Sequence, residues 1–202
     1  MNKKIIRIIS CVLLVVTVIG LAACSSNPAQ NTTQNPTPAV ASTPEPSETE
    51  QTSTGNRIYF AGPLFNEAER EYNLKLTTIL ESYGYEVFLP QRDGYLATEL
   101  DGKTEAEKTE MIFRKDRDEV LKADILFMTL DGRVPDEGAC VELGIAYASG
   151  KRCYGIKGDA RSVEIDMDVN PMLTGCFIKL FYNLDDEALI ASLEDYLKNN
   201  QL

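Results

Sequence analysis

The 202-residue sequence predicts an α/β fold, a doubly wound and mostly parallel five-stranded sheet with helices on both faces. Two observations lead to this prediction. Short β-rich runs alternate along the chain with longer stretches whose apolar residues recur at helical spacing. One β-rich run, residues 124–130, is apolar almost throughout, as expected of a strand buried on both faces of a parallel sheet. The expected architecture is a flavodoxin- or Rossmann-like three-layer sandwich.

The elements follow one another in alternating order, and glycine or proline closes several of them. Gly62 ends the first β-rich run, Gly84 ends the first helical stretch and Pro90 ends the second β-rich run. The predicted strands are 57–61, 85–89, 124–130, 152–156 and 177–181, and the predicted helices are 66–83, 105–122, 137–149 and 185–199. The polar stretch 91–103 has no periodicity and is predicted to be a surface loop over a site.

Several loops follow strands directly. They are 62–66, 90–104, 131–137 and 158–174. Because ligands of such folds bind beyond the carboxyl ends of the strands, we expect these loops to gather there and to carry the site.

The first 24 residues have the layout of a secretory signal. A positively charged segment precedes the apolar run 8–21, and small residues lead up to Cys24. The stretch Leu21-Ala22-Ala23-Cys24 resembles the lipobox of bacterial lipoproteins. This implies that 1–23 is a signal peptide and that Cys24 is lipidated, anchoring the chain at the extracytoplasmic face of the bacterial cell membrane. The alternative is an uncleaved membrane anchor, although the run is shorter than the ~20 residues that a spanning helix needs.

Residues 24–55 are rich in Ser, Thr and Pro and have almost no large apolar side chains. Such a segment cannot bury enough surface to offset the entropy of ordering, so we expect a disordered tether. The remaining residues, 56–202, are enough for a single domain with one core.

The composition excludes several classes of function. The net charge is −11, which argues against a nucleic acid polymer as partner because such partners demand basic patches. The chain has no histidine, which excludes Ser-His-Asp triads and His-ligated metals. Any transfer or hydrolytic chemistry must therefore use carboxylates, and neither a metal nor an organic cofactor is expected.

The cysteines of the domain lack the spacing of a metal site. They are Cys140, Cys153 and Cys176. Free buried thiols are the simpler interpretation, and one disulfide among them is the alternative in an oxidising compartment.

Glu142 is the most unusual residue of the predicted helix 137–149. It lies among small and apolar residues about one turn into the helix, and Gly138 before it allows a close approach of the backbone. A carboxylate in such surroundings is costly unless it is used or paired. Glu142 is therefore a candidate nucleophile, with a structural role near the helix N-terminus as the alternative.

Asp116 is less conspicuous. Counting along its helix places it near the amino end of the third strand, and the charged run 114–118 is equally consistent with a solvated, self-neutralising helix face. Residue patterns alone favour that second interpretation over a catalytic role.

Blocks of residues occur in a defined order along the domain. They are Ile58-Tyr59-Phe60-Ala61-Gly62-Pro63, Asp116 ahead of Ala123-Asp124-Ile125, the Asp-x-Gly-x-x-x-Glu-x-Gly pattern from Asp136 to Gly144, and Asn170-Pro171-Met172. With this order the chain resembles the nucleoside 2-deoxyribosyltransferase family over 57–198. The resemblance implies a retaining, two-step transfer of 2-deoxyribose between a 2′-deoxynucleoside and a free nucleobase.

The resemblance also implies roles for individual residues. Glu142 is expected to attack C1′ of the nucleoside while Tyr59 orients it. Asp116 and Asp136 are expected to contact the departing base and help to protonate it. Asn170 is expected to hold the sugar, often from a neighbouring subunit, which implies a homo-oligomer. The other expected substrate-binding residues are Gly62, Gln91, Gly138 and Met172, of which Gln91 stands where the family has a base-recognising polar residue.

Two other functions are compatible with the sequence. One is an N-glycoside hydrolase on the same fold, acting on nucleosides or their monophosphates, with water in place of the second base. The first loop, Gly62-Pro63-Leu64-Phe65, lacks a phosphate-binding pattern and favours nucleosides. The other is a non-catalytic nucleoside-binding lipoprotein, although such receptors usually have two lobes and are larger.

Overall fold

The computed structural model of the chain describes residues 55–160 and 168–202. The predicted signal peptide 1–23, the predicted lipidation residue Cys24 and the predicted tether up to residue 54 lie outside the described residues. Within the residues that the structure describes, no helix combines the length and the apolar character needed to cross a membrane.

Parallel strands form one sheet of five, in the order β2-β1-β3-β4-β5. The strands are β1 (Arg57–Ala61), β2 (Glu86–Phe88), β3 (Ile125–Thr129), β4 (Arg152–Lys157) and β5 (Lys179–Tyr182). This order confirms the predicted doubly wound α/β fold. The direction of winding changes between β1 and β3, so the switch point, where such folds bind ligands, lies at the carboxyl ends of these two strands.

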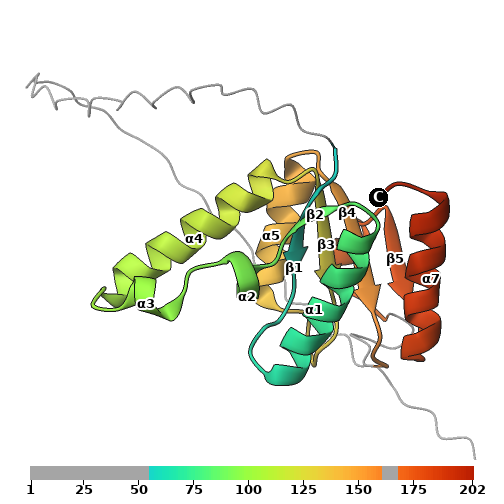
Figure 1. The fold of residues 1–202 in the computed structure, drawn as a ribbon, viewed down its shortest axis with the longest axis horizontal. Helices are drawn as coiled ribbons and strands as arrows, with labels where there is room; N and C mark the ends of the chain where they lie inside the picture. Colours follow the sequence, from blue (N-terminus) through green and yellow to red (C-terminus); the bar gives the residue numbers. More distant parts are fainter. Residues whose placement is uncertain (1–54, 161–167) are drawn as a thin grey trace, which may run out of the picture. The chain divides into compact units, whose positions relative to one another are not determined.

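Helices cover both faces of the sheet, which gives the three layers seen in Figure 1. Helices α1 (Glu67–Ser82) and α7 (Asp186–Asn199) pack on one face. Helices α4 (Glu105–Lys122) and α5 (Glu137–Ala148) pack on the other. The amino-terminal half of α4 extends beyond the sheet (Figure 1).

Successive side chains of the central strand β1 belong to different cores. Ile58 and Phe60 pack with the side chains of α1 and α7. Tyr59 and Ala61 pack on the opposite face, with the side chains of α4 and α5. Alternation along a strand thus places Tyr59 on the same face of the sheet as the helix that carries Glu142.

Local sequence determines where the long helices begin. The Asn66 side chain accepts a hydrogen bond from the Glu69 amide, and the Glu69 side chain accepts one from the Asn66 amide, which makes a capping box for α1. Thr104 and Glu107 make the same arrangement at α4. Gly84 follows α1 with φ of 89°, a conformation that favours glycine.

The structure corrects two of the predicted loops. The stretch 91–103 is not irregular throughout, because short helices α2 (Pro90–Asp93) and α3 (Ala97–Leu100) occupy part of it. The predicted loop 158–174 contains helix α6 (Pro171–Thr174), which Asn170 caps. Helices of four residues are too short to show an apolar periodicity in the sequence.

The fifth strand begins two residues later than predicted. The amides of Cys176 and Phe177 donate to the carbonyls of Leu173 and Thr174 in α6, so these residues continue the turn of that helix. Pairing with β4 starts with the Ile178 amide, which donates to the Cys153 carbonyl.

Candidate active site

Tyr59 and Glu142 meet between the sheet and α5. The Tyr59 hydroxyl donates a hydrogen bond to Oε1 of Glu142 at 2.7 Å. Tyr59 is fully buried on β1, and its ring stacks on Phe88 of the neighbouring strand, which fixes the direction of the hydroxyl. The structure therefore brings together two residues that the sequence places 83 positions apart.

The surroundings of Glu142 favour its protonated form. The pKa of Glu142 is raised to about 7, mainly by burial and further by the negative charges of Asp116 and Asp136, while the hydrogen bond from Tyr59 opposes the rise. Among the described residues Glu142 forms no ion pair. The carboxylate is thus neither a surface charge nor half of a salt bridge.

Asp136, and not Glu142, caps helix α5. The Asp136 side chain accepts a hydrogen bond of 2.8 Å from the Ala139 amide. A Cβ on Gly138 would lie 3.1 Å from Oδ1 of Asp136, so the glycine leaves room for this contact. The alternative of a capping Glu142 is therefore wrong, and the only hydrogen-bond partner of its half-buried carboxyl within residues 55–160 and 168–202 is Tyr59.

The charge of Asp116 acts on both members of the Tyr59–Glu142 pair. This negative charge adds to the effect of burial in raising the pKa values of Glu142 and of Tyr59. Burial, opposed by Lys115 and assisted by Glu119, raises the pKa of Asp116 itself to about 6.

The basic neighbours of Asp116 have other partners. Arg114 pairs with Glu110, and Arg117 pairs with Asp118. The charged run is therefore self-neutralising only in part, and Asp116 is its half-buried member that no arginine neutralises.

The residues expected to hold the sugar lie at α6. Asn170 caps this helix through a 2.9 Å hydrogen bond from the Met172 amide to its side chain, and Met172 is 79% exposed. Neither residue makes a hydrogen bond to Tyr59 or Glu142 within the described part of the chain. An apolar groove of about 380 Å³ separates α6 from α5. It is lined by Cys140, Leu143, Gly144, Tyr147, Pro171, Met172, Leu173, Gly175 and Cys176.

Gln91 is tied to helix α1. Its Nε2 donates to the Arg70 carbonyl at 2.8 Å, and its Oε1 accepts from Nδ2 of Asn73 at 3.2 Å. Asn73 also donates to the Pro63 carbonyl at 2.8 Å. Sequence reasoning missed Asn73, although a polar residue on the buried face of an amphipathic helix was a signal that could have found it.

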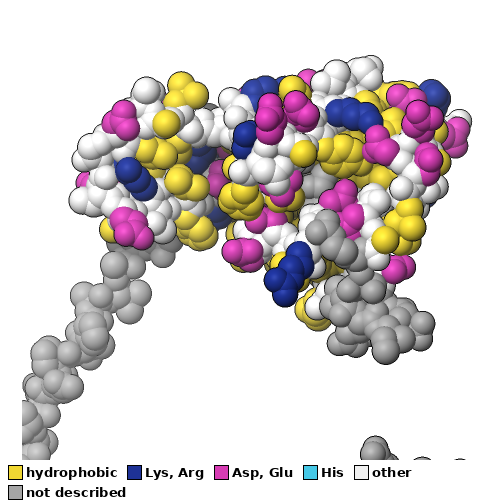
Figure 2. Space-filling model, turned by 90° about the horizontal axis from the view of Figure 1, so that it is seen from below, with side chains coloured by type: hydrophobic (Ala, Val, Ile, Leu, Met, Phe, Trp, Pro, Cys, Tyr) yellow, Lys and Arg dark blue, Asp and Glu magenta, His cyan; other side chains and the backbone are white. Residues whose placement is uncertain are grey.

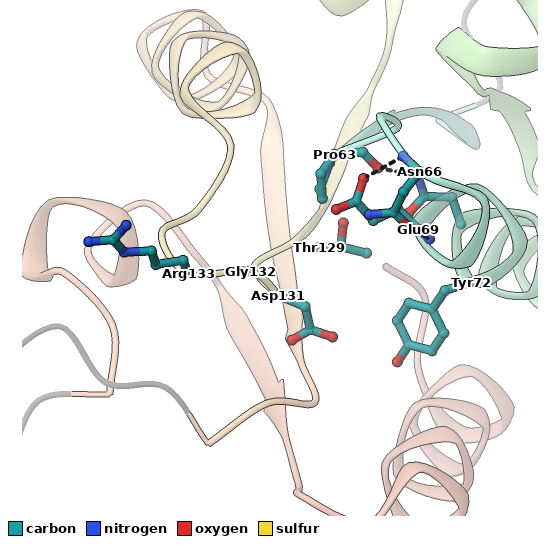
Figure 3. A pocket seen from close by; sticks show the side chains of 9 residues that line it. Pro63, Asn66, Glu69, Tyr72, Thr129, Asp131, Gly132 and Arg133 are labelled. Atoms are coloured by element: carbon teal, nitrogen blue, oxygen red, sulfur yellow. Dashed lines mark hydrogen bonds between the residues drawn. The ribbon is translucent and has the colours of Figure 1, made fainter.

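A polar cavity of about 320 Å³ lies at the carboxyl ends of β1 and β3, the switch point of the sheet. Figure 3 shows Tyr72 and Asp131 facing each other across it, with the Arg133 side chain turned away. Its lining residues are Pro63, Asn66, Glu69, Tyr72, Asn73, Thr129, Asp131, Gly132 and Arg133. Neither Tyr59 nor Glu142 lines this cavity. The cavity therefore adjoins the loop after β1 and not the Tyr59–Glu142 pair.

Gly62 is required by close packing at this edge. A Cβ on Gly62 would lie 2.1 Å from Oγ1 of Thr129, too close for any other residue without rearrangement. The loop after β1 therefore passes directly over the end of β3.

The surface at the carboxyl ends of the strands is of mixed charge. Figure 2 looks onto this end and shows Lys and Arg side chains scattered among Asp and Glu, with apolar side chains between them. The described residues also contain no group of three or more Cys, Asp and Glu side chains placed to hold a metal ion.

The model of the nucleoside 2-deoxyribosyltransferase family matches residues 58–193. The chain belongs to this family. The match covers both residues of the buried pair and both neighbouring aspartates, and it supports a glycosyl-transfer enzyme.

Solved structures agree with the fold. The chain is similar to a 2-deoxyribosyltransferase from Bacillus psychrosaccharolyticus, with 27% identity over 66% of this chain and 95% of that chain and a TM-score of 0.53. It is also similar to a conserved protein from Enterococcus faecalis V583, with 24% identity over 71% of this chain and 98% of that chain and a TM-score of 0.58. No sequence among the curated proteins matches the chain significantly.

Proposed function

We propose that this family member transfers 2-deoxyribose from a 2′-deoxynucleoside to a free nucleobase through a covalent intermediate on Glu142. The observation that carries the proposal is the Tyr59–Glu142 pair, a half-buried carboxyl with a hydrogen bond from a buried tyrosine and no ion-pair partner in the described chain. Family membership and the similarity to the Bacillus transferase support the same chemistry.

In the first step, an oxygen of Glu142 forms a bond to C1′ as the bond from C1′ to the base nitrogen breaks. The Tyr59 hydrogen bond engages Oε1, which leaves Oε2 as the attacking oxygen. The electron pair of the broken bond goes to the base nitrogen. A 2-deoxy sugar reaches the oxocarbenium-like transition state readily because no 2-hydroxyl withdraws electrons, so a positioned carboxylate and a proton for the base suffice.

The proton for the departing base comes from Asp116 in this proposal. Its pKa of about 6 keeps part of the population protonated near neutral pH. Asp136 accepts a hydrogen bond from the Ala139 amide and contributes negative charge near Glu142. In the second step the new base attacks C1′, the ester bond to Glu142 breaks, and the base's proton returns to Asp116.

Hydrolysis uses the same intermediate with water as the acceptor. The two outcomes are separated by incubating residues 56–202 with a deoxynucleoside, with and without a second base. Chromatography should show a new deoxynucleoside only when the second base is present. Release of free deoxyribose at the same rate in both reactions would favour the hydrolase, and unchanged substrate in both would contradict the proposed function.

A further inference from the structure

Asn73 joins two segments that border the candidate site. It lies on α1 and is only 3% exposed, and its Nδ2 donates both to the Pro63 carbonyl and to Oε1 of Gln91. We propose that Asn73 is a positioning residue that holds the loop after β1 and the start of α2 in the arrangement that binds the nucleoside. This inference rests on the proposed function and assigns no contact between Asn73 and substrate.

The hydrogen bonds determine the orientation of both side-chain amides. A backbone carbonyl can only accept, so the atom of Asn73 that faces the Pro63 carbonyl must be Nδ2. The atom of Gln91 that faces the Arg70 carbonyl must likewise be Nε2. Oε1 of Gln91 then accepts the second hydrogen of Nδ2 of Asn73. Each hydrogen bond in the series from the Pro63 carbonyl to the Arg70 carbonyl therefore has one donor and one acceptor.

The loop after β1 makes further hydrogen bonds to α1, but among those described only the one from Asn73 comes from a buried side chain. The exposed Arg70 side chain donates to the Leu64 carbonyl, and Glu69 accepts from the Phe65 amide. Water competes with these exposed contacts, whereas the amide of Asn73 is shielded. Without Asn73, the Pro63 carbonyl and Oε1 of Gln91 would both lose their donor.

The position of these ties connects them to the reaction. Pro63 follows β1, the strand that carries Tyr59, and Gln91 lies just after β2. Gly62 packs directly on Thr129, so the end of β3 already fixes the start of the loop. Asn73, on α1, holds the next loop residue, Pro63, and also binds Gln91. It makes no hydrogen bond to the Tyr59–Glu142 pair within the described residues.

The test uses Asn73→Leu, which keeps a similar volume but removes the donor. Thr77→Val is the matched control, because Thr77 is one turn further along α1, fully buried, and has a hydroxyl without a partner in the described structure. Hydrogen exchange of the free protein should become about tenfold faster in peptides covering 62–66 and 90–94 of Asn73→Leu, but not in α7. Thr77→Val should exchange like the wild type.

Kinetics then connect this loosening to substrate. Asn73→Leu should raise KM for the deoxynucleoside about tenfold and change kcat less than threefold, because the nucleophile and its tyrosine are unaffected. The double variant Asn73→Leu, Gln91→Leu should raise KM no more than the larger of the single changes, since both act through one chain of hydrogen bonds.

Each contrary result is informative. Unchanged exchange at either segment, or faster exchange with an unchanged KM, would overturn the positioning role. A loss of kcat that parallels a loss of stability, or additive effects in the double variant, would do the same. If wild-type protein does not act on deoxynucleosides, the proposed function fails, and the exchange arm still decides whether Asn73 holds the two segments.

Discussion

The hydroxyl of Tyr59 donates to Oε1 of Glu142 at 2.7 Å, and the charges that act on this carboxyl are those of Asp116 and Asp136. One hydrogen bond is thus the main favourable interaction of a buried carboxylate. This relationship supports the proposed role of Glu142 as nucleophile, because a structural glutamate would be paired with a cation or with amides.

Replacing Glu142 with Gln should abolish turnover while keeping the fold. Loss of the attacking carboxylate should lower kcat by several orders of magnitude, each tenfold being about 1.4 kcal/mol of barrier. Wild type quenched during turnover should carry a deoxyribosyl adduct on the peptide with Glu142, as seen by mass spectrometry. Glu137→Gln, in the exposed first turn of the same helix, is the control and should keep its activity. Near-normal turnover of Glu142→Gln without a wild-type adduct would contradict the proposal.

The same substitution should stabilise the protein at high pH. The folded-state pKa of Glu142, about 7, is above the ordinary value of 4.5, so folding favours the protonated form. Wild-type stability therefore falls as pH rises from about 4.5 through 7, by roughly 2 kcal/mol after allowance for partial exposure. Glu142→Gln should melt above wild type at pH 8 and together with it at pH 4. Equal melting temperatures at both pH values would show that the carboxylate is not destabilising.

Tyr59→Phe should reduce activity and shift its pH dependence. A hydrogen bond to a charged group contributes about 1.5–3 kcal/mol, so kcat should fall about 10- to 100-fold. Because this bond lowers the pKa of Glu142, the higher of the two pKa values that bound the active pH range, its loss should move the alkaline limb of the rate profile to higher pH. Tyr154→Phe, on the opposite face of the sheet, should leave the profile in place. A lower rate with an unmoved limb would mean that Tyr59 does not act on the carboxylate.

The rate should have a bell-shaped dependence on pH. Glu142 must be ionised and Asp116 protonated, and their pKa values of about 7 and 6 define the limits of the bell. The productive form is then the minor one, roughly a tenth of the singly protonated population, because the acid is stronger than the nucleophile's conjugate acid. Asp116→Asn should remove the alkaline limb, whereas Asp118→Asn should keep the bell. Persistence of the alkaline limb in Asp116→Asn would show that a group other than Asp116 donates the proton to the base.

We propose that Asn170 serves the site of a neighbouring subunit. It lies exposed at the start of α6 and makes no hydrogen bond to the Tyr59–Glu142 pair of its own chain. Glu142→Gln and Asn170→Ala should each be inactive alone, and mixing them under subunit exchange should restore activity, because some sites then combine intact Glu142 with intact Asn170. If the mixture is no more active than the two variants measured separately and added, this arrangement is contradicted. A purely monomeric protein in sedimentation would contradict it as well.

We further propose that Cys24 is the lipidated N-terminus of a membrane-anchored enzyme. The proposal depends on the sequence around Cys24 alone, since residues 1–54 lie outside the described structure. Cys24→Ala should lose membrane association after cell fractionation, whereas Cys11→Ala, in the apolar run, should keep it. Retention of Cys24→Ala in the membrane fraction would favour an uncleaved anchor.

Periodicity was sufficient for the fold because each long helix and each strand buries a continuous face. One core was expected from the sequence, whereas the buried side chains form two clusters, with Ile58 and Phe60 on one face of β1 and Tyr59 on the other. The site was less accessible, since proximity across the sheet is not encoded locally. Residue patterns alone favoured a solvated helix face for Asp116, whereas its charge acts on Glu142, and Asn73 was overlooked because its partners, Pro63 and Gln91, lie in other segments.

The absence of a neighbouring cation around Glu142 in the described chain has a consequence for ligand design. Glu142, Asp116 and Asp136 create a negative potential at the place where the proposed sugar carbon becomes electron-deficient. A protonated iminosugar, with its nitrogen in place of the anomeric carbon, would supply the missing positive charge permanently and not only at the transition state. Such a compound should bind more tightly than the neutral nucleoside, and it should lose that advantage at low pH, where the carboxylates that attract it become protonated.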